Sequence, residues 1–317
     1  MLSLSLGSLS WGACDKVCTA LAHKGEHTYP QCWGYLQSQF QACMFGDEAV
    51  YTRIETELMK VGLRGTTVVA ASGDGASHFA FGPFQGGIGD ALNTIICDSM
   101  HMPVYPTSSP FVLSVGGTEW SSDDMYGPTC SSTQPCGWDS GGGGFAWSAA
   151  ANAPYQNTTV PAYIAKANGV APKTMSVAGT FDPTQRAYPD LAALAQFGIP
   201  LCDYGGCSGS GGTSASAPTV GGMLSLINDK RLNAQLPPLG FINTKLYSLM
   251  ADATAYAECF TDIGIEKVGD EWDCDTFSTC EGCDAPNARG FVATKGWDAQ
   301  TGFGQPKFDG LLKHFGQ

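Results

Sequence analysis

Charged residues are scarce in this sequence, and it contains no long hydrophobic run. Charged side chains make up 14% of the 317 residues, against about 25% in an average soluble domain. Basic residues are the fewest, at 16 against 29 acidic ones, whereas nucleic acid or an anionic membrane surface requires a basic face on its partner. No apolar stretch approaches the length of a membrane span. We therefore expect neither nucleic acid nor a membrane as a partner.

Cysteine, by contrast, is abundant. The 13 cysteines lie mostly in sequence rich in Gly, Ser, Thr and Asp, without histidine at the spacing of a zinc site. We expect most of them to form local disulfides, which indicates a secreted protein or one of a lysosomal or vacuolar lumen, with one thiol left over. The glycosylation sequon at Asn157 agrees with this location. The cysteines that are close in sequence are Cys14 and Cys18, Cys32 and Cys43, Cys130 and Cys136, Cys202 and Cys207, and the group Cys274, Cys280 and Cys283.

The first seven residues alternate apolar and small polar side chains, which is the period of a β-strand. They also lack the basic head of a secretion signal. Because a luminal protein needs such a signal and this chain opens inside a strand, we expect further sequence upstream of Met1.

The centre of the chain alternates helical and strand patterns. Residues 47–63 place apolar side chains such as Val50 at helical spacing, and a β-rich run follows at 66–71. Residues 111–115 have the pattern of another short apolar strand, and residues 218–230 that of a largely apolar helix. This alternation predicts an α/β fold with a mostly parallel sheet covered by helices on both faces. In such folds the loops at the carboxyl ends of the strands hold the functional residues.

The string SGGTSASAP at 210–218 joins a glycine turn to the start of a helix. We expect Pro218 in the first helical turn, where amides have no partner inside the helix. Small neighbours allow a substrate backbone to approach the Ser214 hydroxyl, and the amino end of the helix offers N–H groups to an oxyanion. The structural alternative is a Ser/Thr helix cap after a glycine turn. The length of the string favours a nucleophile.

Asp74 lies between two glycines directly after the strand predicted at 66–71. An aspartic acid that stays protonated beside a nucleophile can donate a hydrogen bond to an oxyanion, and carboxyls do stay neutral in apolar sites or acidic media. The structural alternative is an Asx turn. The presence of the Ser214 string in the same chain favours the functional interpretation.

No histidine stands in the His-Gly-Thr setting that a subtilisin-type base would occupy. His78 follows Asp74 by four residues, and we interpret it as a loop residue. A hydrolase that uses His78 as its base is one alternative, and it predicts activity near neutral pH rather than in acid.

At these residues the chain resembles the sedolisins, the serine-carboxyl peptidases whose group contains tripeptidyl peptidase I. The resemblance runs essentially end to end and implies a single subtilisin-like domain over residues 1–317 that hydrolyses peptide bonds at acidic pH. It implies Ser214 as the nucleophile and Asp74 as the acid that stabilises the oxyanion. Besides the two strings above, it rests on residues 57–60 (ELMK), 105–110 (YPTSSP), 115–118 (VGGT), 186–190 (RAYPD) and 237–241 (PPLGF).

The resemblance further implies two backbone segments that flank the substrate and pair with it, a strand at 4–7 and the glycine-rich segment 140–145. From the residues alone, that glycine run is equally compatible with a flexible turn. The substrate-binding residues implied in this way are Ser5, Leu6, Gly7, Gly143 and Gly144.

In the family, a glutamate base and the aspartate that orients it lie on one helix before the first of these strands. The resemblance therefore implies a fold that is incomplete at the N-terminus, and we assign no base. Without an activating partner, a serine hydroxyl loses several orders of magnitude in reactivity. The glutamates that belong instead to the later helix are Glu48, Glu55 and Glu57.

A calcium site within about residues 258–312 is implied by the same resemblance, since Ca²⁺ prefers oxygen ligands. Thr294 replaces a glycine that is usual in the family, and Lys295 puts a positive charge beside the cation. The alternative is an ordinary Gly-Trp-Asp turn. The implied ligands are the carboxylates of Asp262 and Asp298 and the carbonyls of Ile263, Thr294 and Gly296.

Two main functions follow. The first is a peptidase acting on peptides or proteins, either a tripeptidyl-peptidase or an endopeptidase, with its own missing N-terminal segment or a propeptide as a partner. An upstream helix bearing Glu and Asp would support it. The second is a non-catalytic luminal protein that kept the cleft and binds peptides, for which no such segment is expected.

Overall fold

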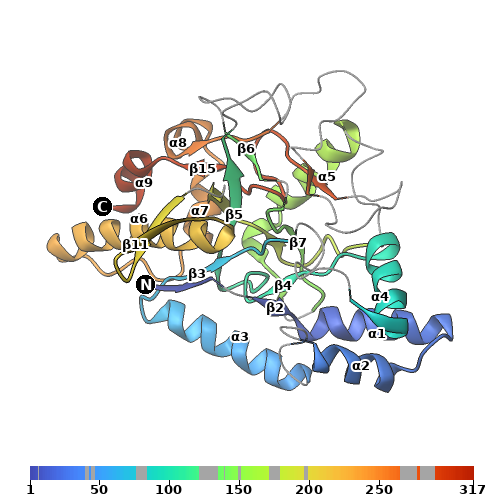
Figure 1. Ribbon diagram of the computed structural model, residues 1–317. Coiled ribbons are helices and arrows are strands. Elements are labelled where there is room, and N and C mark those ends of the chain that lie inside the picture. Colours follow the sequence, from blue (N-terminus) through green and yellow to red (C-terminus); the bar gives the residue numbers. More distant parts are fainter. Residues whose placement is uncertain are drawn as a thin grey trace.

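The structure, a computed structural model, describes residues 1–5, 7–39, 43, 47–75, 84–120, 135–138, 140–148, 151–170, 179–195, 199–264, 277–278 and 290–317 (Figure 1). Within these ranges no helix has the length and apolar character needed to cross a membrane. The helices are α1 (Trp11–Lys24), α2 (Tyr29–Ser38), α3 (Glu48–Leu63), α4 (Gly86–Ser99), the 3-10 helix η3 (Pro154–Gln156), α5 (Thr159–Val170), α6 (Thr213–Asn233), α7 (Asn243–Leu249), α8 (Ala253–Cys259) and α9 (Phe308–Phe315). The strands are β1 (Leu2–Leu4), β2 (Ser8–Leu9), β3 (Val68–Ala71), β4 (Val104–Tyr105), β5 (Leu113–Glu119), β6 (Cys136–Gly137), β7 (Gly144–Phe145), β8 (Ala187–Tyr188), β9 (Leu191–Leu194), β10 (Ile199–Asp203), β11 (Gly206–Ser210), β12 (Phe260–Thr261), β13 (Phe277–Ser278), β14 (Phe291–Val292) and β15 (Gln305–Pro306).

The central sheet is mostly parallel, as the sequence predicts. Strand β3 pairs in parallel with β1 on one side and with β5 on the other, and β5 pairs in parallel with β9. Only the short strand β6 runs antiparallel, beside the end of β5. Pairs such as Val69 with Leu113 and Val115 with Leu191 set the register.

Helices cover both faces of this sheet (Figure 1). Alternate residues of β3 point to opposite faces, which is the period of a strand. Val69 belongs to the large core cluster that also contains Val220 and Leu224 of α6. Val68 belongs to a separate cluster, against which Leu58 of α3 packs. The predicted α/β architecture is therefore confirmed.

Helix α3 matches the predicted range. Asp47 caps it, since its carboxylate accepts the Val50 amide at 2.9 Å. Of the predicted apolar row, Leu58 packs on the core whereas Val50 is 41% exposed. The apolar spacing therefore found the helix and part of its buried face, but not Tyr51 and Glu55, which are buried.

Helix α6 begins at Thr213, five residues before the predicted start. Pro218 lies inside the helix rather than in its first turn, so that expectation is wrong. Similarly, β5 does not end at residue 115, as predicted, but continues through Gly116 and Gly117 to Glu119. A Cβ at Gly116 would lie 2.8 Å from the Pro189 ring, which explains why glycine occupies this buried strand position.

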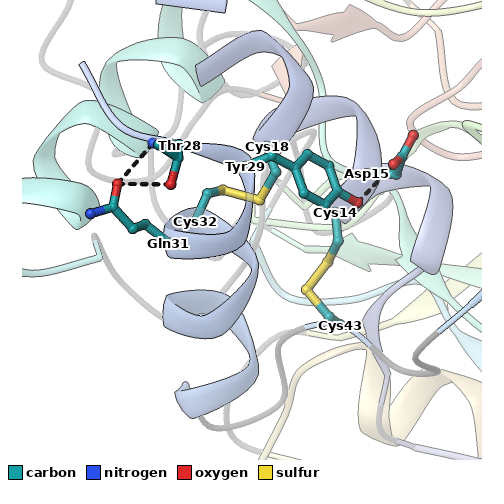
Figure 2. Close-up of a disulfide and its surroundings, with 8 residues drawn as sticks. All are labelled: Cys14, Asp15, Cys18, Thr28, Tyr29, Gln31, Cys32 and Cys43. Carbon is teal, nitrogen blue, oxygen red and sulfur yellow. Dashed lines mark hydrogen bonds between the residues drawn. A yellow bond between two sulfur atoms is a disulfide. The ribbon is translucent and has the colours of Figure 1, made fainter. Parts of the chain in front are cut away.

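Helices α1, α2 and α4 pack together at one end of the molecule (Figure 1). Figure 2 shows two disulfides here, Cys14–Cys43 and Cys18–Cys32. The expectation of local bridges is therefore wrong for these four cysteines. Cys14 and Cys18 are one turn apart on α1, where Cβ atoms are about 5–6 Å apart, beyond the about 3.5–4.5 Å that a disulfide allows.

The remaining cysteines partly follow the sequence expectation. Cys202 and Cys207 form the expected bridge across the hairpin of β10 and β11. Cys136 is also disulfide-bonded, and Cys259 is a free, buried thiol. Four others lie outside the described residues, namely Cys130, Cys274, Cys280 and Cys283.

A buried ion pair joins β9 to the rest of the core. Arg186 and Asp190 are both fully buried, with Arg186 Nη2 donating to Asp190 Oδ2 at 2.6 Å. The same oxygen accepts the Ser114 amide at 2.7 Å and Asn243 Nδ2 at 3.1 Å. The Tyr247 hydroxyl donates to Asp190 Oδ1 at 2.8 Å. The segment 186–190 therefore acts as a hydrogen-bonded junction between β5, β9 and α7.

Candidate active site

Ser214 is the second residue of α6, directly after the glycine turn. Gly212 precedes the helix with a φ of +81°, a conformation that favours glycine. A Cβ at this position would also lie 2.5 Å from Asp74 Oδ2. The turn therefore needs Gly212 both for its backbone conformation and for the approach of Asp74.

Asp74 is held against the start of α6. It follows β3 by three residues, and its Oδ1 accepts the Thr213 amide at 2.8 Å and the Thr213 hydroxyl at 2.7 Å. The Thr213 hydroxyl oxygen in turn accepts the Gly73 amide at 3.1 Å. Because Thr213 is the neighbour of Ser214, the structure brings the predicted nucleophile and the predicted acid together.

The Ser214 side chain contacts the end of β1. Its hydroxyl donates to the carbonyl of Ser5 at 2.7 Å. The Ser5 hydroxyl donates back to the carbonyl of Ser214 at 3.2 Å. Both residues are half-buried, so the Ser214 hydroxyl lies at the edge of the fold rather than deep in the core.

Backbone amides at the start of α6 face the same region. Thr213 N–H donates to Asp74, and Ala215 N–H donates to the carbonyl of Gly212 at 2.9 Å. The Ser214 N–H has no such acceptor among the described residues. Asp74 Oδ1 already accepts two bonds, and the role of Asp74 in binding an oxyanion stays a prediction.

The glycine run lies against its own chain. The Gly142 amide donates to the carbonyl of Gly73 at 2.8 Å, beside Asp74. A Cβ at Gly143 would lie 1.8 Å from the carbonyl oxygen of Ala299, and Gly143 and Gly144 are both buried. The run is therefore a close backbone contact that supports the Asp74 loop, and its contact with a substrate stays a prediction.

The strand expected at 4–7 is shorter than predicted, because β1 ends at Leu4. Ser5 lies against Ser214, and Gly7 packs closely on Val104 and the Tyr105 carbonyl. Leu6 lies outside the described residues. The roles of these three residues in substrate binding stay predictions.

The candidate bases do not gather at Ser214 in the described part of the chain. His78 lies outside the described residues. Glu48 and Glu57 are exposed on α3. Glu55 is buried, and its Oε2 accepts the Ser109 hydroxyl at 2.6 Å. We therefore assign no base.

The predicted calcium ligands come together in one loop region. Asp262 Oδ2 accepts the Gly296 amide at 2.9 Å, and Asp298 Oδ2 accepts the Thr294 amide at 3.1 Å. The Thr301 hydroxyl bridges Asp298 Oδ1, at 3.1 Å, and the Ile263 carbonyl, at 3.4 Å. This cluster therefore unites all five predicted residues.

Burial disfavours the ionised form of both carboxyl groups in this cluster. Burial raises the pKa of Asp298 well above its usual value, and Asp262 raises it further. Burial likewise raises the pKa of Asp262. Asp262 Oδ1 is buried without a hydrogen-bond donor at normal distance. Among the described residues, no three His, Cys, Asp or Glu side chains converge on one metal position, so most ligands would be carbonyl oxygens.

Sequence reasoning missed two polar residues around Ser214, namely Thr213 and the side chain of Ser5. Thr213 could have been found from the sequence, since it stands in the same string as the predicted nucleophile. The contact of the Ser5 hydroxyl could not, because the two residues it joins are 209 positions apart in the sequence.

No family model matches the chain, but curated proteins do. Tripeptidyl-peptidase 1 of Macaca fascicularis is 31% identical over 310 residues, which cover 92% of this chain and 46% of that protein. The human protein is 30% identical over the same shares of both chains. That of Bos taurus is 32% identical over 268 residues, covering 82% of this chain and 39% of the relative. The chain therefore spans less than half the length of these relatives.

Among solved structures, a Pseudomonas sedolisin, described as a serine-carboxyl proteinase complexed with two molecules of pseudo-iodotyrostatin, has a TM-score of 0.53 and 20% identity. It covers 98% of this chain and 63% of that chain. At this identity the likeness concerns the fold, and it confirms the predicted subtilisin-like α/β architecture. Together the two comparisons confirm the resemblance that the sequence motifs predicted.

Proposed function

Because this chain belongs to the sedolisin family, with tripeptidyl-peptidase 1 among its homologues, we propose that it is part of a serine-carboxyl peptidase that hydrolyses peptide bonds at acidic pH. The observation that carries the proposal is the pair of hydrogen bonds from Thr213, the neighbour of Ser214, to Asp74 Oδ1. The proposed domain comprises residues 1–317. Its substrates are peptides or proteins, cleaved as tripeptides or internally.

In the proposed reaction, Ser214 Oγ attacks the carbonyl carbon of the scissile bond and the carbonyl oxygen becomes an oxyanion. Ser214 N–H and a protonated Asp74 donate to that oxygen. Because Oδ1 already accepts two bonds from Thr213, Oδ2 is the oxygen that holds the proton. The C–N bond then breaks, the amine leaves with a proton, and water releases the acyl group from Ser214.

The serine proton requires a base, and this chain has none that we assign. In the proposed enzyme the base belongs to a segment outside residues 1–317. Its own N-terminal segment, or a propeptide, is therefore a proposed partner of this chain.

A peptide-binding protein without catalysis is the second candidate. It is favoured by the hydrogen bond from the Ser214 hydroxyl to the Ser5 carbonyl, since that carbonyl cannot act as a base. Such a protein would use the same cleft and leave the bound peptide intact.

A serine-directed fluorophosphonate at about pH 4, applied to this chain joined to the segment that carries the proposed base, separates these candidates. A peptidase is labelled at Ser214, and labelling disappears in Ser214→Ala but persists in Ser225→Ala, which changes an exposed serine of the same helix. Asp74→Ala, which removes the donor, is expected to slow labelling about 10²–10³-fold, as loss of an oxyanion donor does. A chain that retains peptides on a column without being labelled contradicts the peptidase proposal and supports the binder.

We further propose that Asp262, Ile263, Thr294, Gly296 and Asp298 hold Ca²⁺. The buried Asp262 Oδ1 without a hydrogen bond supports this, as does the proximity of the half-buried Asp262 carboxylate to the fully buried Asp298 carboxylate. A bound cation would relieve their repulsion.

Calcium at about 100 times its dissociation constant should raise the free energy of unfolding by about 2.7 kcal/mol. The measurement is urea unfolding with Ca²⁺ or with a chelator. Asp262→Asn should abolish the difference, whereas Asp252→Asn, an exposed helix cap nearby, should retain it. Equal curves with and without Ca²⁺ in the unsubstituted protein would contradict the site.

The three described disulfides are typical of an oxidising compartment. We therefore place the protein in the secretory pathway or in a lysosomal or vacuolar lumen.

A further inference from the structure

The hydrogen-bond ladder of α6 is interrupted at Ser214. In an α-helix, the amide four residues ahead donates to each carbonyl. Four residues after Ser214 stands Pro218, which has no N–H, inside the helix. The carbonyl of Ser214 therefore lacks the donor that the helix would otherwise supply.

A residue that directly follows β1 takes the place of that donor. Ser5 Oγ donates to the Ser214 carbonyl at 3.2 Å, and the Ser5 carbonyl accepts the Ser214 hydroxyl at 2.7 Å. The two serines thus exchange two hydrogen bonds, one at the backbone and one at the side chain of Ser214. Ser5 follows directly on β1, a strand of the central parallel sheet.

We infer that Ser5 is a positioning residue for Ser214, its hydroxyl replacing the amide that Pro218 lacks. This inference rests on the proposed function of Ser214 as a nucleophile. An amide at residue 218 would tie the Ser214 carbonyl only to its own helix. The Ser5 hydroxyl ties it to β1 instead, so the nucleophile is held relative to the sheet edge where a substrate is expected.

The two bonds differ in what happens to them during the reaction. The bond from the Ser214 hydroxyl to the Ser5 carbonyl must break before that hydroxyl can give its proton to a base. The bond from the Ser5 hydroxyl to the Ser214 carbonyl involves none of the reacting atoms and can persist throughout. The Ser5 hydroxyl therefore still holds the backbone of Ser214 after the bond from the Ser214 hydroxyl to the Ser5 carbonyl has broken.

A double-mutant cycle between Ser5 and Pro218 tests this directly. The variants are Ser5→Ala, Pro218→Ala and the pair together, with Ser5→Thr to keep the hydroxyl and Ser3→Ala as an exposed control on β1. The first readout is the rate of fluorophosphonate labelling of Ser214 in the chain joined to the segment that carries the proposed base. The second, independent of reactivity, is hydrogen–deuterium exchange of the peptide segment that contains Ser214.

Ser5→Ala should slow labelling about three- to tenfold, the range for one net hydrogen bond, and should speed exchange around Ser214. Ser3→Ala should behave like the unsubstituted protein, and Ser5→Thr, which keeps the hydroxyl, should recover most of the labelling rate and of the protection from exchange that Ser5→Ala loses. With Pro218→Ala, the restored amide should make Ser5→Ala nearly neutral, within about twofold in both readouts.

Two results overturn the inference. One is an equal effect of Ser5→Ala with and without Pro218, which would show that the hydroxyl does not replace the amide. The other is a change in exchange without any change in labelling, which would make the contact merely structural. If the unsubstituted protein is not labelled at all, the proposed peptidase function is contradicted independently of Ser5. The hydrogen–deuterium exchange of the four variants then decides whether Ser5 holds Ser214.

Discussion

Replacing Glu55 by glutamine should remove a stability term that depends on pH. Glu55 lies on α3 and is only 3% exposed. Burial raises its pKa from 4.5 to about 7, although hydrogen bonds from Ser109, Tyr51 and Tyr105 lower it and the charge of Arg186 does so further. Glutamine keeps the volume of the side chain and cannot ionise. The substitution therefore isolates the protonation of this one buried carboxyl.

The magnitude follows from the two pKa values. Between pH 4.5 and about 7 the folded chain keeps the Glu55 proton and the unfolded chain loses it, so stability falls as the pH rises. The stabilisation is complete below the unfolded pKa and is lost as the pH rises through the folded pKa. At about 1.4 kcal/mol per pKa unit, the shift corresponds to about 3 kcal/mol of the free energy of unfolding. Protonated Glu55 thus favours the fold in acid.

Urea unfolding at a series of pH values from about 4 to 8 measures this term. Relative to the unsubstituted protein, Glu55→Gln should lose about 3 kcal/mol less stability across that range. Glu57→Gln, exposed on the same helix and paired with Lys60, is the matched control and should leave the slope nearly unchanged. Parallel stability curves for the unsubstituted protein and Glu55→Gln would refute the reasoning, because they would mean that Glu55 titrates alike in both states.

Two further predictions concern the core and the surface. Asp190→Asn should destabilise the fold by about 3–5 kcal/mol, because it leaves the fully buried Arg186 guanidinium without its counter-charge; urea unfolding measures it, and a loss below about 1 kcal/mol would contradict the role of this pair. Asn157 is exposed between η3 and α5, so secretion from a eukaryotic host should add one glycan that Asn157→Gln removes; an intact mass without a glycan would contradict an accessible sequon.

The sequence predicted the parallel sheet well because its signals are local. A buried parallel strand needs a short apolar run, and β3 has one directly after a capped helix. The start of α6 was misplaced because Pro218 was assigned to the first turn. Proline usually marks that position, but here the side chain of the residue directly after β1 compensates for the amide that Pro218 removes from the helix interior.

The contacts between distant segments could not be predicted in the same way. Tyr51 and Glu55 are buried because they meet Tyr105 and Ser109, which lie about 50 residues away in sequence. The pairing of Cys18 with Cys32 likewise depends on how α1 and α2 pack. For the candidate site, the strings identified Ser214 and Asp74, but only the fold reveals Thr213 as the link between them.

The protonation of Glu55 also follows from the balance of buried charge. Within the described part of the chain, Arg186 is the only fully buried lysine or arginine. It forms an ion pair with the Asp190 carboxylate at 2.6 Å. Ser109 stands between this pair and Glu55, since its carbonyl accepts Arg186 Nε at 3.2 Å and its hydroxyl donates to Glu55. An ionised Glu55 would add a second buried carboxylate to a single buried cation, whereas a protonated one leaves the pair neutral. An acidic medium supplies that proton, so protonated Glu55 favours the fold at the pH at which the proposed chemistry runs.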